Sequence, residues 1–294
     1  MASSSKLTSS NANISGGLIL PVYDSDPGDG SVSEIAYVGG QLKYYNNGKW
    51  IHINDSAADG LTETSAVDKS TDILVSNPAA PTGWYWIKTN GVARQYWVDN
   101  SFQGGGWVLV ASHPINVSIP TLTYAQAAQS YSGNASSTYG SGDPKSYSVW
   151  VGLNGWNDIV TANNAGRNFV YYTAGSQISL SNIASHSRRS SWKWTGWSST
   201  FQWNGVSALS NDVGGSTPGL WSYHIGNNYS FTTSDTDQDA YGANCSSAFN
   251  NAPWWYGACW DGNFWGGNGS GYANAAFWTS SGGDYYTYGA MYVK

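Results

Sequence analysis

The sequence predicts a loop-rich protein of the α+β class, mostly β, in which strands outnumber helices. Charged residues make up only 10% of the 294 residues, whereas aromatic residues make up 15%, including 17 Trp and 21 Tyr. A chain this aromatic can bury enough apolar surface to fold, which excludes a disordered protein. Its 36 glycines, together with many Ser and Asn, favour turns and strands over a helical bundle.

The charge balance narrows the possible partners. The net charge at neutral pH is -6, so the chain offers no basic field for a phosphate backbone, and nucleic acid is excluded as a partner. No apolar run approaches the roughly 20 residues of a membrane span. We therefore expect a partner with a neutral surface, such as a glycan, and no membrane insertion.

The first residues predict synthesis in a cytoplasm, and the cysteines predict later exposure outside the cell. The opening MASSSKLTSSNANIS lacks the charged and then apolar order of a secretory signal. The only two cysteines, Cys245 and Cys259, suit an oxidising environment, where disulfides persist. A protein that is assembled inside a cell and exposed on lysis, as virion proteins are, satisfies both observations.

The N-terminal part predicts a tail and a small β module. Residues 1–15 are rich in Ser, Thr and Asn, and residues 16–54 alternate β-forming residues around two turn signals, Gly39-Gly40 and Asn46-Asn47-Gly48. This pattern predicts three or four strands. So small a module would be marginally stable alone, so we expect it to support oligomerisation.

A polar segment then leads into the large domain. Residues 55–76 contain no aromatic residue and predict a linker or a short helix. Asn77-Pro78 marks the entry to the domain at residues 77–294.

Within the large domain, short runs of β-forming residues predict strands, and one segment predicts a helix. The strands are expected at Trp107–Ala111 and Val149–Leu153, with a strand pair over Ser191–Trp203. Tyr124–Ser130 predicts a helix, for which Thr121 or Thr123 can serve as the N-cap. The alternating Trp residues of 191–203 could form a sugar-binding platform, but in a chain with 17 Trp core packing is the favoured interpretation.

Three alternating carboxylates, Asp235, Asp237 and Asp239, predict a cation-binding loop. Alternate residues of an extended segment point to the same side, so their oxygens can converge, and calcium prefers carboxylate and carbonyl oxygens. An acidic, solvated turn is the alternative interpretation. The segment is not an EF-hand, because Ala240 and Ser246 stand where that loop needs Gly and a bidentate Glu.

The surroundings of this loop resemble the fibrinogen-like recognition domains of ficolins, tachylectins and the fibrinogen chains. The shared order is the D-x-D-x-D motif, Tyr241, Asn244-Cys245, the pair Trp254-Trp255 and then Cys259. Upstream, the glycine-rich stretch at 104–107 is similar to the GGGW of that family, and Gly83–Ile87 and Tyr96–Asp99 look like its first strands. The resemblance covers about residues 77 to 294.

The N-terminal module resembles short modules that recur in bacteriophage tail and fibre proteins. The resemblance rests on LPVYDSDP and LKYYNNGKW, at residues 20–27 and 42–50. It implies that the N-terminus attaches to other virion proteins and that the protein belongs to a tail fibre or a capsid appendage. Together with the missing secretion signal and the usefulness of multivalency for weak glycan sites, this resemblance leads us to expect a homotrimer held by residues 1 to about 60.

The fibrinogen-like resemblance implies a calcium site and a disulfide. The calcium ligands would be the side chains of Asp237 and Asp239 and the carbonyl oxygens of Tyr241 and Ala243, with Asp235 close by. Cys245 and Cys259 would form the disulfide. In the chain-entropy model, closing a loop of about 15 residues stabilises a fold by up to roughly 3 kcal/mol.

The same resemblance implies a ligand pocket beside the second cysteine. A cis peptide bond at Ala258–Cys259 would turn main-chain N–H groups towards an acetyl oxygen, and such bonds persist only where the surrounding structure enforces them. The pocket for the acetyl methyl group would be lined by Phe249, Trp260, Tyr272 and Ala273. Trp260 replaces the usual His and Phe249 the usual Tyr, so stacking surface is gained and polar contacts are lost. Trp254 and Trp255 are expected to be core anchors.

The leading functional hypothesis is a calcium-assisted, lectin-like binding module of a phage fibre or appendage that recognises acetylated or other glycans on a host surface. A structural decoration or assembly protein is the alternative, and a glycan-degrading enzyme is a third possibility. Hydrolysis needs two placed carboxylates, yet the only two Glu, Glu34 and Glu63, lie outside the large domain. The four His show no metal-ligand spacing and no G-x-S-x-G motif is present, so we expect no enzyme.

Overall fold

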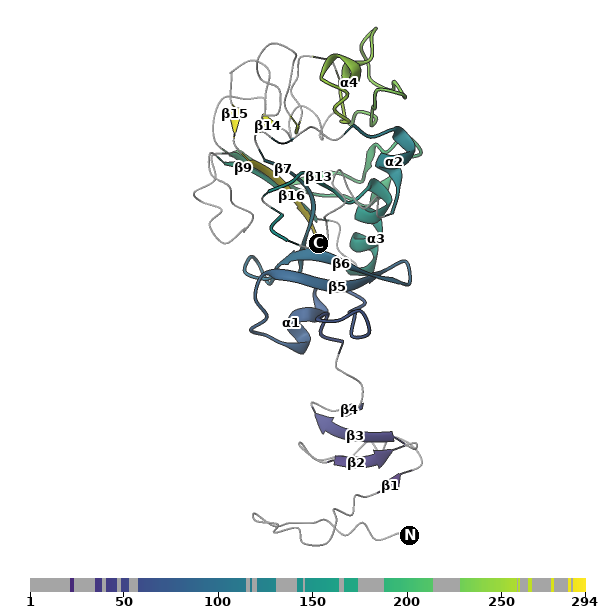
Figure 1. The fold of residues 1–294 in the computed structure, drawn as a ribbon, viewed down its shortest axis with the longest axis vertical. Helices are drawn as coiled ribbons and strands as arrows, with labels where there is room; N and C mark the ends of the chain where they lie inside the picture. The colour runs from purple at the N-terminus through teal and green to yellow at the C-terminus, as the bar shows by residue number, and fades with distance from the viewer. Residues whose placement is uncertain are drawn as a thin grey trace. The chain divides into compact units, whose positions relative to one another are not determined.

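The computed structural model of the chain (Figure 1) divides into two compact units, Met1–Ala57 and Ala58–Lys294. The structure describes residues 22–23, 35–38, 41–46, 49–52, 58–114, 117, 121–130, 142–144, 146–163, 167–173, 188–213, 228–257, 259, 264–265, 276–277, 285–286 and 288–294. None of the helices in these ranges is long and apolar enough to cross a membrane.

The first unit contains a four-stranded sheet in its described residues. Its strands are β1 (Val22–Tyr23), β2 (Ile35–Val38), β3 (Gln41–Asn46) and β4 (Lys49–His52), in the order β1-β2-β3-β4. β1 pairs with β2 in parallel, and the other neighbours are antiparallel. The two turn signals fall at the β2–β3 and β3–β4 junctions, in agreement with the predicted three or four strands.

The second unit is built on an antiparallel sheet whose centre is buried. In chain order the strands are β5 (Gly83–Thr89), β6 (Val92–Asp99), β7 (Trp107–Pro114), β8 (Val149–Trp150), β9 (Arg167–Thr173), β10 (Arg188–Lys193), β13 (Ser207–Val213) and β16 (Tyr288–Val293). Their order across the sheet is β13-β10-β9-β16-β7-β6-β5, with β8 paired to β7. Every residue of β7 and β16 is buried, so these strands form the middle of the core.

Short helices and two small hairpins complete the described part of this unit. The helices are α1 (Asp72–Ser76), α2 (Tyr124–Ala128), α3 (Leu153–Asn163) and α4 (Cys245–Ala248). The hairpins pair β11 (Gly196–Trp197) with β12 (Trp203–Asn204), and β14 (Ala276–Phe277) with β15 (Tyr285–Tyr286). Figure 1 shows α4 at the opposite end of this unit from β5 and β6. The strand-rich mixture with few helices confirms the predicted α+β class.

The helix predicted over Tyr124–Ser130 forms as α2, which ends two residues earlier, at Ala128, and has Thr123 as its N-cap. The Gln126 main-chain N donates to the Thr123 hydroxyl at 3.2 Å, and the Thr123 main-chain N donates to the Gln126 side chain at 2.9 Å. This reciprocal capping box satisfies two N–H groups that a helix start otherwise leaves unpaired.

The strand predicted at Val149–Leu153 is shorter than expected. β8 ends at Trp150, and Leu153 already begins α3. Between them Gly152 has a φ of +87°, and a Cβ at this position would collide with the carbonyl oxygen of Gln129. Only glycine tolerates both conditions, so the chain turns from strand to helix here.

Residues 55–76 were predicted to be a linker or a short helix; residues 58–76 belong to the second unit, and α1 forms the short helix. Val67 forms a bridge with Ile87 of β5, and the Ser70 hydroxyl donates to the Gly106 carbonyl oxygen at 2.7 Å. Ile73 of α1 is buried. These contacts attach the polar segment to the second unit. The boundary between the two units accordingly lies between residues 57 and 58.

Tryptophan side chains fill much of the core. The described tryptophans that are buried are Trp107, Trp150, Trp156, Trp192, Trp194, Trp203, Trp254, Trp255 and Trp265. The Trp255 ring stacks on Trp197 at a centroid distance of 5.7 Å and lies 5.0 Å from Trp203. Core packing is thus the role of the aromatic residues of 191–203 and of the pair Trp254-Trp255, as predicted from the sequence.

His113 of β7 is a buried titratable group with a consequence for stability at acidic pH. Its Nδ1 lies 2.8 Å from the Ser148 hydroxyl, and its ring lies edge-on to Trp265 at 5.7 Å. Burial lowers the pKa of His113 from 6.5 to about 4. The imidazole is therefore neutral in the folded protein at neutral pH.

We expect His113 to make the fold less stable as the pH falls. The folded pKa is below the unfolded pKa, so the contribution is complete above pH 6.5 and is lost as the pH falls from 6.5 to about 4. The loss amounts to about 3 kcal/mol. Urea unfolding of the wild type and His113→Asn at several pH values in this window checks it. A stability difference between the two proteins that does not change with pH would contradict the assignment.

Candidate functional site

The acidic loop is held at its start by the core. The main-chain N–H and carbonyl groups of Thr232 and Trp254 exchange two hydrogen bonds, at 2.8 and 3.0 Å. Thr233 and Thr236 then close a tight turn through two more, at 3.0 and 3.1 Å. These hydrogen bonds fix the start of the segment that carries Asp235, Asp237 and Asp239.

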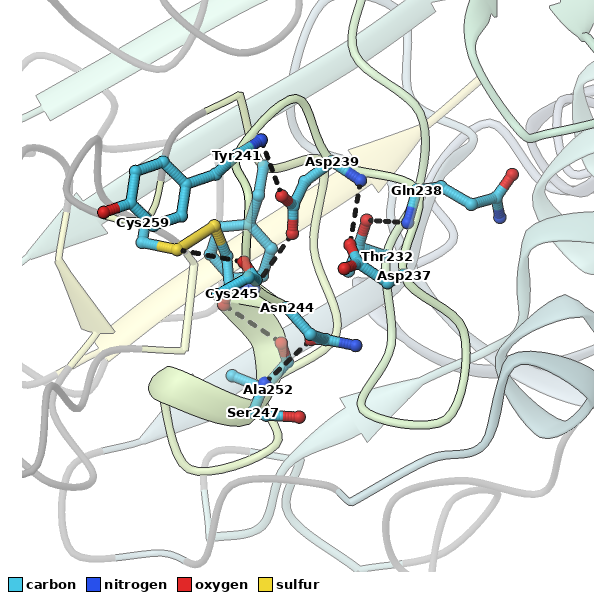
Figure 2. Close-up of a disulfide and its surroundings, with 12 residues drawn as sticks. Thr232, Asp237, Gln238, Asp239, Tyr241, Asn244, Cys245, Ser247, Ala252 and Cys259 are labelled. Atoms are coloured by element: carbon cyan, nitrogen blue, oxygen red, sulfur yellow. Dashed lines mark hydrogen bonds between the residues drawn. A yellow bond between two sulfur atoms is a disulfide. The ribbon is translucent and has the colours of Figure 1, made fainter.

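Asp239 and Asp237 form the centre of the loop (Figure 2). Asp239 Oδ1 accepts from the Tyr241 main-chain N at 2.9 Å, and its Oδ2 accepts from the Cys245 main-chain N at 2.9 Å. Asp237 Oδ1 accepts a longer bond from the Asp239 N at 3.4 Å. Burial raises the pKa of the Asp239 carboxyl, and the charge of Asp237 adds to this rise, although the two N–H donors oppose it. The pair therefore holds negative charge that is only partly balanced.

Asp235 has a different environment. Its Oδ1 accepts from the Thr233 hydroxyl at 2.7 Å and from the Tyr124 main-chain N, the first residue of α2, at 2.9 Å. Burial by itself would raise the pKa of Asp235, but these hydrogen bonds outweigh it and the pKa is lowered. Asp235 thus attaches the loop to α2, and its predicted place beside the calcium ligands stays a prediction.

The cysteines form the predicted disulfide, with their Cα atoms 4.7 Å apart. Asn244 caps α4 by accepting from the Ser247 N at 3.0 Å, and its Nδ2 donates to the Thr233 carbonyl oxygen at 2.9 Å. The sulfur of Cys259 lies 3.6 Å from the Ala243 carbonyl oxygen. Since Cys245 also donates to Asp239, both ends of the bridge contact the acidic loop (Figure 2).

The turn before Cys259 is in contact with the same loop. The Ala240 N donates to the Gly257 carbonyl oxygen at 3.2 Å. On its other side, Gly257 lies so close to the Tyr229 ring that a Cβ would collide with it. Sequence reasoning missed Tyr229, because nothing in its local pattern indicates a contact with a residue 28 positions away.

The predicted ligand pocket is described only in part. Ala258, Trp260, Tyr272 and Ala273 lie outside the described residues, and so does the conformation of the Ala258–Cys259 bond. Phe249 is only 4% exposed, and its ring stacks on Tyr256 at 5.6 Å. Burial, with a contribution from the charge of Asp239, raises the pKa of Tyr256. Phe249 and Tyr256 therefore connect the core to the region of the disulfide.

Comparison with known proteins identifies the architecture. No protein-family model matches the sequence. The structure is similar to the fibrinogen-like globe domain of human ANGPTL6, with a TM-score of 0.55, 19% identity, and coverage of 78% of this chain and 95% of that one. The globe domain of human ANGPTL2 gives 0.54 and 18%, covering 78% and 98%. The fold is fibrinogen-like.

A third similar structure includes a ligand. It is the lamprey fibrin D-dimer in complex with the peptide Gly-His-Arg-Pro-amide, with a TM-score of 0.55, 17% identity, and coverage of 78% of this chain and 73% of that one. Identities this low establish the fold and transfer no site residue. The predicted fibrinogen-like fold is thereby confirmed at the level of architecture.

The carboxylate oxygens of the acidic loop can be compared with those expected to bind calcium. Each Asp239 oxygen accepts one hydrogen bond and keeps a lone pair, and Asp237 has one oxygen without a described bond. Among the described residues no three His, Cys, Asp or Glu side chains gather around one point. The two carboxylates have oxygen atoms that could hold a calcium ion together with main-chain carbonyl oxygens and water, whereas the described residues do not form a site of three carboxylates.

Proposed function

We propose that the fibrinogen-like unit is a calcium-binding recognition domain and that it binds acetylated or other glycans on a host surface. The observation that carries this proposal is the carboxylate pair Asp237 and Asp239, which is fixed beside a disulfide and a tight turn by short hydrogen bonds. A fixed loop with partly balanced negative charge favours a divalent cation. The role is one of binding and not of catalysis.

Calcium would be held by the side chains of Asp237 and Asp239 with the carbonyl oxygens of Tyr241 and Ala243. A bound ion would supply positive charge that offsets the repulsion between the carboxylates. The chain itself would position the turn, since Ala240 bonds to Gly257 and the Ala243 carbonyl contacts Cys259. A cation that fixes the loop at residues 235–243 would therefore also help to fix the recognition turn at residues 257–259.

The glycan part of the proposal rests on the low charge of the chain and on the surroundings of the turn. Only 10% of residues are charged, and the net charge of -6 is unfavourable for anionic polymers. Ligand sites combine apolar walls with a few polar groups. The proposed contacts are Phe249, Ala258, Cys259, Trp260, Tyr272 and Ala273. Fibrin, which shares the fold, binds a peptide ligand, and we propose ligand recognition by this chain as well.

The N-terminal unit would attach the chain to a virion, as part of a tail fibre or capsid appendage, and would hold a homotrimer. The support is the small size of the unit that carries the four-stranded sheet, because so short a chain buries little of its surface by itself. Three copies would present three recognition domains to one surface, and multivalency raises the avidity of weak sites.

A glycan array tests the proposal directly. The full chain, with its copy number measured first by light scattering, is applied to acetylated sugars and their deacetylated counterparts, with calcium and with a chelator. We expect binding that favours the acetylated members and declines when calcium is removed. Binding to no glycan would reject the recognition role and leave the structural alternative, whereas binding unaffected by the chelator would reject the role of calcium.

A further inference from the structure

Tyr241 differs from the other aromatic residues in the described part of the fibrinogen-like unit. Its side chain is 52% exposed, whereas every other Trp, Phe and Tyr of this unit whose burial the structure describes is buried or half-buried. In a chain that packs its rings so consistently against one another, an exposed ring loses the free energy of burial. Core packing therefore does not explain the aromatic residue at this position.

The main chain that carries the Tyr241 ring is fixed. The Tyr241 N donates to Asp239 Oδ1 at 2.9 Å, and the other oxygen of that carboxylate accepts from the disulfide residue Cys245. The preceding residue, Ala240, donates to the Gly257 carbonyl oxygen. An exposed tyrosine on a fixed loop loses little conformational entropy when a ligand covers it, because only two side-chain torsions remain to be ordered.

The ring is also close in the chain to the proposed recognition turn. Ala240 is bonded to Gly257, one residue before the Ala258–Cys259 peptide, so Tyr241 is one residue from that contact. In Figure 2 the Tyr241 ring extends on the side of the Cys245–Cys259 disulfide, away from Asp237 and Gln238. A ligand seated beside Cys259 would therefore lie on the same side of the loop as the ring.

We propose that the Tyr241 ring stacks on the apolar face of a sugar ring bound at the turn, so that one residue serves two partners. Its carbonyl oxygen serves the calcium ion, and its side chain serves the glycan. This inference rests on the proposed function and adds a ligand contact outside the acetyl pocket. The chemistry fits a neutral pyranose, because its C–H face is apolar while the nearby carboxylates of Asp237 and Asp239 disfavour anionic ligands.

The two roles can be separated by substitution. Tyr241→Ala removes the ring but keeps the carbonyl oxygen, and Tyr241→Phe keeps the ring and removes only the hydroxyl. The probes are N-acetylglucosamine, N-acetylgalactosamine and N-acetylneuraminic acid with their deacetylated counterparts, titrated by calorimetry in calcium. For the tightest-binding probe we expect Tyr241→Ala to lose about tenfold or more in affinity. Tyr241→Phe should bind this probe as the wild type does, and the calcium affinity of both variants is measured in parallel to separate the two roles.

Each other outcome overturns a defined part. If the wild type binds a probe and Tyr241→Ala binds it equally well, the stacking role is rejected and the recognition function stands. If Tyr241→Ala loses calcium affinity together with sugar affinity, the ring acts through the cation loop and is not a ligand contact. If the wild type binds none of the probes, the acetylated-glycan function and the stacking role are rejected together.

Discussion

Calcium binding is expected to disappear when Asp237 and Asp239 are both replaced by alanine. The double variant loses the two charged ligands and keeps only carbonyl oxygens, which bind calcium weakly without carboxylates. Since disturbing even a partner of a metal ligand costs about 10- to 100-fold in affinity, loss of both ligands should exceed 100-fold. Isothermal titration calorimetry with calcium measures it, and equal affinity in the variant and the wild type would remove the site.

Asp235→Asn is the matched control for this experiment. Asn keeps a side-chain oxygen that can accept from Thr233 and from the start of α2, while it removes one negative charge from the same loop. Calcium affinity should therefore remain close to that of the wild type.

Because the pKa of Asp239 is raised, the calcium affinity of the wild type should also weaken as the pH falls towards that pKa and protons compete with calcium.

Replacing Trp255 with alanine is expected to destabilise the fibrinogen-like unit by about 3–5 kcal/mol. The side chain is fully buried, its ring lies 4.8 Å from Phe231, and its Nε1 donates to the Phe201 carbonyl oxygen at 2.7 Å. Truncation leaves a cavity and an acceptor without its donor. Guanidinium unfolding followed by near-ultraviolet circular dichroism measures the loss.

Two further variants serve as references for the stability loss of Trp255→Ala. Trp255→Phe keeps an aromatic ring and should cost less than alanine. Val75→Ala changes a side chain that is 78% exposed, so its effect should stay within about 0.5 kcal/mol. If Trp255→Ala were no more destabilising than Val75→Ala, Trp255 would not be an anchor of the core.

Features set by neighbouring residues were predicted well from the sequence. Thr123 caps α2 because Gln126 stands three residues later, and the glycine and asparagine turn signals separate the strands of the N-terminal sheet. The disulfide between Cys245 and Cys259 was predicted because the two cysteines stand in an order of residues that resembles a known family. In each case the determining contacts lie within a short stretch of chain.

Features set by distant residues were missed or incomplete. Asp235 bonds to Tyr124, which is 111 positions away, and Ser70 bonds to Gly106 in a segment that looked like a linker. The contact between Tyr229 and Gly257 has no local signature either. A polar residue alone does not indicate which remote N–H or carbonyl group it will meet, because tertiary packing decides this.

The position of β16 has a consequence for how the protein is made. This strand lies between β9 and β7, and it pairs Val293 with Val108. At roughly 5–20 residues per second, the ribosome delivers residues 288–293 on the order of ten seconds or more after β7. Throughout that interval, one edge of β7, a strand that is buried along its whole length in the finished fold, lacks its neighbour, and an unpaired strand edge favours aggregation. The nascent chain should therefore depend on chaperones until β16 emerges, however stable the finished sheet is.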